Sequence, residues 1–277
     1  MLATRGQGRS PLARRAALAA VALASWLALS TATVAAPPPY DLGDAPDSTN
    51  HPVIGMTAYG AFVAARFPTV FDPATGPVQG PRHLNINGFW LGQFVTGEQD
   101  ADLFPDADGV TNITPGTNTN NRDRADDGVP PVSPTITLPQ CGPTQFKYIV
   151  TGAAAPPVAG ARVNVWFDWN RDGDWEDIFT CTDSAGVARI VREWAVQNQG
   201  VPVAAGSAVF ATPVFNSANF GQFREVWMRI SIAETAAPLN PATGRADGRG
   251  PAGGYKYGET EDYYTVYVGP GADWRPQ

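Results

Sequence analysis

The residues best suited to chemistry form an acidic turn near the middle of the chain. Asp168, Asn170 and Asp172 present side-chain oxygens at every second position, and Gly173 follows them directly. Calcium takes about six to eight oxygen ligands, and a glycine permits the sharp bend that wraps a short loop around an ion. The spacing matches the opening half of an EF-hand calcium loop. We therefore expect a Ca²⁺ site at this turn.

The remainder of an EF-hand is missing. Phe179 occupies the twelfth position of the loop, where an EF-hand carries a glutamate, and the alternating residues 163–169 predict a strand in place of the preceding helix. Acids from elsewhere must complete the ligand shell, and those of the last strand are the nearest candidates. A hydrogen-bonded turn without metal is the alternative. The full set of expected ligands is Asp168, Asn170, Asp172, Asp174, Glu176, Glu259, Glu261 and Asp262.

Enzymatic signatures are absent from the sequence. It contains no Gly-x-Ser-x-Gly elbow, no His-Glu-x-x-His motif and no phosphate-binding loop. His51 and His83 belong to no recognisable catalytic set, and we expect both at the surface. We predict a protein without catalytic residues or an organic cofactor. Paired carboxylates leave one alternative, a secreted hydrolase acting on glycosidic bonds.

The elements that position these residues are predicted to be strands. Glycine and proline make up about a fifth of the chain, which favours many short strands joined by turns. The predicted fold is all-β, an antiparallel β-sandwich of about seven strands preceded by an acidic, loop-rich N-terminal segment. A short apolar run at 58–67 could form one or two helical turns, and we expect a mobile loop at 236–254. The strands are expected at 135–138, 145–151, 161–169, 187–195, 201–212, 225–233 and 262–268.

The composition of the chain divides it into four expected parts. Residues 1–35 carry four arginines ahead of an apolar run and end in small residues, which indicates a secretory signal peptide. Residues 36–134 are acidic and rich in loops, and the carboxylates at 98–108 and 121–128 must be solvated or bridged by metal. Prolines at 130–134 mark the boundary to the sandwich at 135–268, and 269–277 form a tail.

Charge and cysteines point to the extracellular side. Removal of the signal takes away those four arginines and no acids, so the formal charge moves from -7 to -11. Such a chain repels phosphate backbones, which excludes nucleic acid as a partner, and no segment after the signal is apolar enough to cross a bilayer. Cys141 and Cys181 should form one disulfide in an oxidising compartment, with reactive thiols or zinc ligands as the alternative.

Four stretches in order carry a family resemblance. The sequence Gly258-Glu-Thr-Glu-Asp262 resembles the signature of the GEVED domain family of secreted bacterial proteins, with Thr260 at the usual valine. The other stretches are Asp41-Leu-Gly-Asp-Ala-Pro-Asp47, Arg124-Ala-Asp-Asp-Gly-Val129, and Trp166 to Trp175 followed by the strand Arg229 to Glu234. The resemblance implies a β-sandwich module of exported or surface-displayed proteins, with no established enzymatic activity.

The expected function is therefore a secreted or cell-surface, calcium-stabilised and non-catalytic module for extracellular interaction or adhesion. Its partner would be an extracellular protein, a glycan or a matrix component. A carbohydrate-binding module is the alternative, because exposed tryptophan stacks well on sugar rings. Trp166, Trp169 and Trp175 are the candidates, although burial in the core is the commoner fate of tryptophan.

Overall fold

The computed structural model describes residues 40–49, 55–59, 62–74, 76, 78–98, 125–129, 138–218 and 225–266. All of them belong to one compact unit, residues 37–277. The expected signal peptide, the acidic residues 99–124, His51 and the tail lie outside the described residues. Within the described part, no helix has the length and hydrophobicity needed to cross a bilayer.

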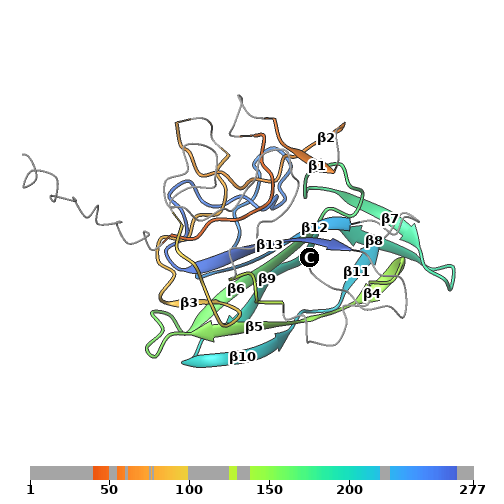
Figure 1. Cartoon of the computed structure of the whole chain (residues 1–277). Helices are drawn as coiled ribbons and strands as arrows, with labels where there is room; N and C mark the ends of the chain where they lie inside the picture. The colour runs from red at the N-terminus through yellow and green to blue at the C-terminus, as the bar shows by residue number, and fades with distance from the viewer. Residues whose placement is uncertain are drawn as a thin grey trace, which may run out of the picture. The chain divides into compact units, whose positions relative to one another are not determined.

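The described chain is all-β, as predicted, and its strands pair antiparallel (Figure 1). It has no α-helix within the described ranges, and the strand count is 13 where about seven were expected. The strands are β1 (Thr57–Tyr59), β2 (Val63–Ala64), β3 (Phe89–Leu91), β4 (Cys141–Thr144), β5 (Lys147–Gly152), β6 (Gly160–Phe167), β7 (Ile178–Thr182), β8 (Ala188–Arg192), β9 (Trp194–Pro202), β10 (Gly206–Ala211), β11 (Phe215–Ala218), β12 (Glu225–Ala233) and β13 (Gly258–Val266).

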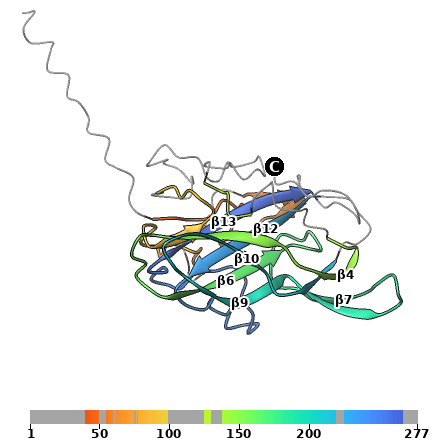
Figure 2. The same cartoon turned by 90° about the horizontal axis from the view of Figure 1, so that it is seen from below.

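The central sheet has the order β13-β12-β6-β9, which Figure 2 shows from below. In β12, Ile230 pairs with Glu261 of β13 on one side and with Val165 of β6 on the other. The pairing of β6 with β9 is irregular between Val163 and Trp166. Smaller sheets, β10-β5-β3, β11-β4, β7-β8 and β1-β2, surround it.

One face of the central sheet forms the main core of the sandwich. Val163, Val165 and Phe167 of β6 and Ile230 of β12 are buried there against side chains of β3, β5 and β11. Alternation along each strand places every second residue on this face. Burying aliphatic and aromatic side chains in this way supplies the main driving force for folding.

The opposite face of the central sheet is buried as well. Trp166 and Trp227 point to this side and form a second core with Leu42, Phe67 and other residues of the N-terminal segment. The segment 234–257 contains the loop 236–254 that we expected to be mobile. It packs here too, since the carbonyl of Ala246 accepts a hydrogen bond from the Trp166 indole at 2.9 Å. The central sheet is therefore covered on both faces.

Several expectations about local structure need correction. The run 58–67 forms the short strands β1 and β2, because its apolar residues Ala58, Tyr59 and Phe67 pack into the second core. The predicted strand 187–195 divides between β8 and β9, and the predicted strand 201–212 between β9 and β10. A bend at Glu193 interrupts the first run, and residues 203–204, which belong to no strand, interrupt the second. The alternation of apolar residues does not reveal either interruption.

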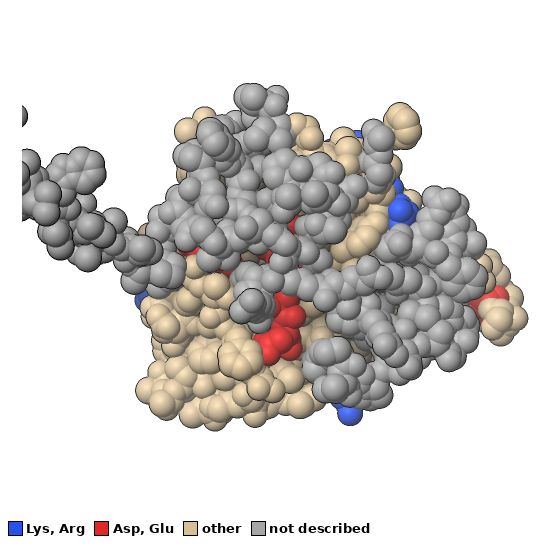
Figure 3. All heavy atoms as spheres, in the orientation of Figure 1, with Lys and Arg blue, Asp and Glu red and all other residues tan. Residues whose placement is uncertain are grey.

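The surface and the disulfide agree with the sequence. On the face seen in Figure 3, acidic side chains form a narrow strip, while lysine and arginine side chains are scattered at the margins. Cys141 of β4 and Cys181 of β7 form the predicted disulfide, which closes 40 residues of chain and joins the β7-β8 hairpin to the sandwich. The described residues include no free cysteine.

Candidate metal centre

The acidic turn connects β6 to β7 and begins at the last hydrogen bond of the β6 ladder. The backbone N–H of Asp168 donates to the carbonyl of Trp227 in β12 at 3.0 Å, so the residue still follows the strand. Alternation then points its side chain to the same face as Trp166. The Asp168 carboxylate is completely buried there.

The turn folds around this carboxylate. Asp168 Oδ1 accepts a hydrogen bond from the N–H of Asp172 at 3.2 Å, and Oδ2 accepts one from the N–H of Gly173 at 2.9 Å. Gly173 has a φ of 93°, and a Cβ there would lie 2.2 Å from the carbonyl oxygen of Ala64. Only glycine fits this position, so the predicted bend is present and rigidly packed.

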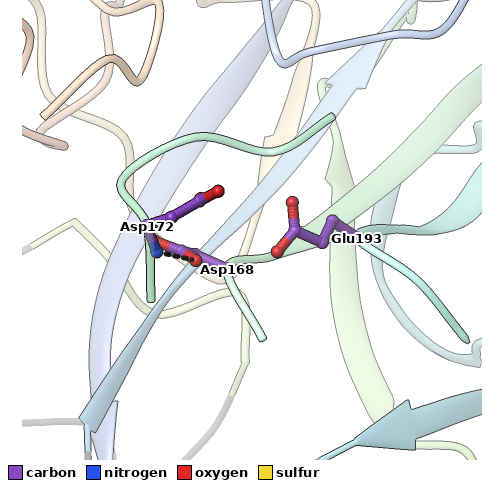
Figure 4. Close-up of side chains that lie close together, drawn as sticks. All are labelled: Asp168, Asp172 and Glu193. Atoms are coloured by element: carbon purple, nitrogen blue, oxygen red, sulfur yellow. Dashed lines mark hydrogen bonds between the residues drawn. The ribbon is translucent and has the colours of Figure 1, made fainter. Parts of the chain in front are cut away.

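Glu193 brings a third carboxylate to the turn. It lies between β8 and β9, is completely buried, and accepts hydrogen bonds from the N–H groups of Trp169 and Asp177, each at 3.0 Å. One carboxylate oxygen each from Asp168, Asp172 and Glu193 lie within 4.8 Å of one another. Figure 4 shows the Glu193 carboxylate facing that of Asp168, with Asp172 beyond it.

Glu193 was absent from the predicted ligands, although the sequence holds a signal for it. It shares strand parity with the buried Val191, so it occupies an inward position where an apolar residue is expected. An inward carboxylate in a strand is costly unless something compensates its charge. An acidic residue at an inward position of a predicted strand is therefore the sequence signal that could have identified Glu193 as a ligand.

The electrostatics of the three groups reflect burial and mutual repulsion. Desolvation, followed by the nearby charge of Asp172, raises the pKa of Asp168 to about 7. Desolvation, followed by the charge of Asp168, raises the pKa of Glu193 well above its ordinary value. The pKa of Asp172 is also raised, first by desolvation and then by Asp174. These carboxylates need protons or a bound cation to offset their charge.

The other predicted ligands within the turn have partners of their own. Asn170 donates its amide to Asp177 Oδ2 at 2.5 Å, while its Oδ1 accepts the N–H of Asp172 at 3.1 Å. Asp174 forms an ion pair of 3.5 Å with Arg66. Glu176 accepts hydrogen bonds from Asn240 and Thr243, both at 2.7 Å. The structure thus gathers Asp168 and Asp172 from the predicted turn and directs Asp174 and Glu176 elsewhere.

The acids of the last strand, which we expected to be metal ligands, do not reach the acidic turn. Glu259 and Glu261 of β13 lie opposite Ile232 and Ile230 of β12, so they point into the main core, on the other face of the sheet from Asp168. Asp262 shares the face of Asp168, but β12 separates their strands. Its two oxygens bond to Arg229 at 2.7 and 2.6 Å. The pairing of strands therefore separates these acids from the turn.

These motif acids instead anchor distant segments of chain. Glu259 accepts the N–H of Leu91 at 2.5 Å, and Glu261 accepts the N–H of Gly128 at 2.8 Å. Asp262 accepts the N–H groups of Asp44 and Ala45 at 2.9 and 2.8 Å. Three acids of one strand thus hold three segments of chain, which gives the motif a structural role.

Thr260 anchors the same region through His83. Its N–H donates to Asp41 Oδ2 at 2.7 Å, and its hydroxyl lies 2.9 Å from His83 Nε2. We expected His83 at the surface, whereas it is completely buried and stacked on Tyr255. Desolvation by burial lowers the pKa of His83 to about 3. The ring is therefore neutral and serves as a packing and hydrogen-bonding group.

None of the three candidate tryptophans for sugar binding is exposed. Trp166, Trp169 and Trp175 each have 3% or less of their surface accessible. Trp175 packs against Phe67 in a tilted arrangement with ring centres 4.3 Å apart, and the Arg229 guanidinium lies 4.7 Å from its ring. All three stabilise the cores of the fold.

Comparison with protein families gives a match to the GEVED domain over residues 162–266. This confirms the resemblance inferred from the motifs, and the matched range contains Asp168, Asp172, Glu193 and the motif Gly258 to Asp262. Comparisons with curated proteins and with solved structures found no match.

Proposed function

From the GEVED match at residues 162–266, we propose that the chain is a secreted or cell-surface, non-catalytic β-sandwich module stabilised by Ca²⁺. The observation that carries the proposal is the convergence of Asp168, Asp172 and Glu193, whose oxygens lie within 4.8 Å of one another. Two of the three side chains are completely buried, so a cation there would offset charges that solvent does not reach.

The donor set favours calcium among the common metal ions. All three donors are carboxylates, and neither cysteine nor histidine takes part, which disfavours zinc. Asn170 Oδ1 and water can add further oxygen ligands, as calcium's irregular shell of about six to eight oxygens requires. Hydrogen bonds from four backbone N–H groups already fix the carboxylates of Asp168 and Glu193. Binding would therefore need little rearrangement.

Three features support placement outside the cell. The signal-like residues 1–35 predict export, the disulfide between Cys141 and Cys181 suits an oxidising compartment, and the predicted mature chain is acidic. Millimolar calcium outside cells suits the weaker affinities that extracellular modules have. The module would present a rigid surface to an extracellular protein, glycan or matrix partner.

Thermal unfolding tests the proposal. Residues 37–277 should unfold at a higher temperature in about 5 mM Ca²⁺ than in chelator, because a ligand that binds only the folded state stabilises it. The same concentration of Mg²⁺ should give a much smaller rise, since magnesium demands a stricter octahedral shell. An unchanged midpoint in Ca²⁺ would refute the calcium site.

A further inference from the structure

A pocket of about 140 Å³ adjoins the metal centre. It lies between the end of the acidic turn, the junction of β8 and β9, and the segment 234–257. The two sites share a wall, because the N–H of Asp177, which lines the pocket, donates to Glu193 Oε2 at 3.0 Å. The side chains used below are Glu176, Asp177, Arg192, Trp194, Gln197 and Arg245.

Trp194 gives the pocket a fixed aromatic wall. Its ring is half-buried and stacks on Trp166 at 11° with ring centres 6.4 Å apart. Its indole N–H donates to Asn164 Oδ1 at 2.9 Å, which holds the ring in one orientation. A rigid, partly exposed indole is the group on which the C–H face of a sugar ring packs well.

The positive and negative charges of the side chains that line the pocket are equal in number. Glu176 and Asp177 carry two negative charges, and Arg192 and Arg245 carry two positive charges. A small anion would meet the two carboxylates, and a small cation would meet the two guanidinium groups. A neutral ligand whose groups both donate and accept hydrogen bonds can use both kinds, and sugar hydroxyls are of that type.

Two side chains remain available for a ligand. Arg192 is exposed, and within the described part of the chain its guanidinium forms no hydrogen bond or ion pair. Gln197 is exposed and donates its amide to the Trp194 carbonyl at 3.1 Å, which leaves its amide oxygen to accept. Both side chains can therefore contact a ligand without first breaking an internal ion pair.

We propose that this pocket binds one neutral saccharide unit, stacked on Trp194 and hydrogen-bonded by Arg192 and Gln197. Its volume of about 140 Å³ is below the roughly 300 Å³ at which sites for drug-sized ligands begin, so one ring of a longer glycan fits. The inference rests on the proposed function, since it names the class of partner that the module would recognise.

Saturation-transfer NMR on residues 37–277 tests it with methyl glycosides of glucose, galactose, mannose and N-acetylglucosamine. Glucuronic acid and glucosamine serve as charged comparisons. At least one neutral glycoside should receive saturation at its ring protons, and Arg192→Ala and Gln197→Ala should each weaken its binding about tenfold. Arg162→Ala, which changes an exposed arginine of β6 outside the pocket, should leave binding unchanged.

Three outcomes would overturn the proposal: no saturation of any neutral glycoside, binding of the charged sugars alone, or binding that the Arg192 and Gln197 variants leave intact. Measuring sugar binding and the calcium dependence of the unfolding midpoint on the same protein separates the two proposals. A calcium-dependent unfolding midpoint without sugar binding refutes only the pocket. Sugar binding without any effect of calcium on the midpoint refutes only the metal site.

Discussion

Arg229 and Asp262 form a completely buried ion pair with two hydrogen bonds of 2.7 and 2.6 Å. The arginine also donates to the carbonyls of Pro68 and Gly248 and to the Thr69 hydroxyl. Gly43 packs against this pair so closely that a Cβ would lie 2.6 Å from Asp262 Oδ2. The ion pair therefore joins β12, β13, the N-terminal segment and the segment 234–257.

Arg229→Met should destabilise the protein by about 3 to 5 kcal/mol. The variant keeps most of the side-chain volume but leaves the Asp262 carboxylate buried without its partner, which is the costly way to break such a pair. Denaturant unfolding of both proteins measures the difference. Arg189→Met is the matched control, because the Arg189–Asp183 pair is partly exposed and solvent screens its attraction, so its loss should be much smaller. Equal losses in the two variants would contradict the role assigned to the buried pair.

Glu193→Gln should remove most of the stabilisation that calcium gives. The change keeps an oxygen that can accept the N–H of Trp169 or Asp177, but it takes one negative charge from the cluster. We expect the difference in unfolding midpoint between Ca²⁺ and chelator to fall to less than half of its original value. Without calcium the variant loses a buried negative charge but sets its amide NH2 against one of the two backbone N–H donors, so we expect its stability in chelator to stay close to that of the original protein.

Asp183→Asn is the control for the calcium effect. Asp183 also accepts backbone hydrogen bonds in a tight turn, from Ala185 and Val187, yet it is not part of the carboxylate cluster. Its variant should keep the full response to calcium. Loss of the response in both variants would indicate general destabilisation and would count against a specific site.

The sequence predicted the fold class, the disulfide and the family, because each depends on local patterns. Alternation in residues 163–169 and 225–233 identified β6 and β12, the two central strands. The sequence holds two cysteines, so each has only the other with which to form an intramolecular disulfide. These features need no knowledge of which strands are neighbours.

The candidate site was predicted only in part, because its residues come together only when particular strands are neighbours. Asp168 and Asp172 are four residues apart in one turn, whereas Glu193 reaches them only through the pairing of β6 with β9. Glu259 and Glu261 were assigned to the same site, but the register of β12 with β13 turns them to the opposite face. Acid-rich motifs do not reveal which face a strand presents.

Removing the disulfide should cost about 4 kcal/mol. Cys141 and Cys181 are 40 residues apart, and a crosslink of that length restricts the unfolded chain by about this amount in the chain-entropy model. Denaturant unfolding of the Cys141→Ala, Cys181→Ala double variant measures the loss. A thiol reductant should destabilise the original protein and leave the double variant unaffected. A reductant effect of the same size on both would assign the loss to something other than this bond.

His83 should make stability fall on acidification from pH 6.5. Its pKa is about 3 in the folded protein and about 6.5 in an unfolded chain, so between these values only the unfolded chain binds the proton. The loss for this residue is about 2 kcal/mol between pH 7 and pH 5. Glu261, whose burial raises its pKa to about 8, acts in the opposite direction over the same range. The contribution of His83 is therefore read as the difference between the original protein and His83→Gln, and identical pH profiles would contradict it.

Thr260, which stands where the motif usually has valine, should stabilise the fold through its hydroxyl group beside the buried His83 ring. His83 Nδ1 lies 3.2 Å from the Tyr257 carbonyl, and Nε2 lies 2.9 Å from the Thr260 hydroxyl, which donates to the Ser231 hydroxyl. Thr260→Val would leave Nε2 and the Ser231 hydroxyl, 2.8 Å from the same oxygen, without this buried partner. We expect a loss of about 1 to 3 kcal/mol. In a double-mutant cycle with His83→Gln, the two losses should sum to about 0.5 to 1.5 kcal/mol more than the loss in the double variant, because both changes remove one shared interaction. Strict additivity would mean that threonine stands at this position for a reason other than His83.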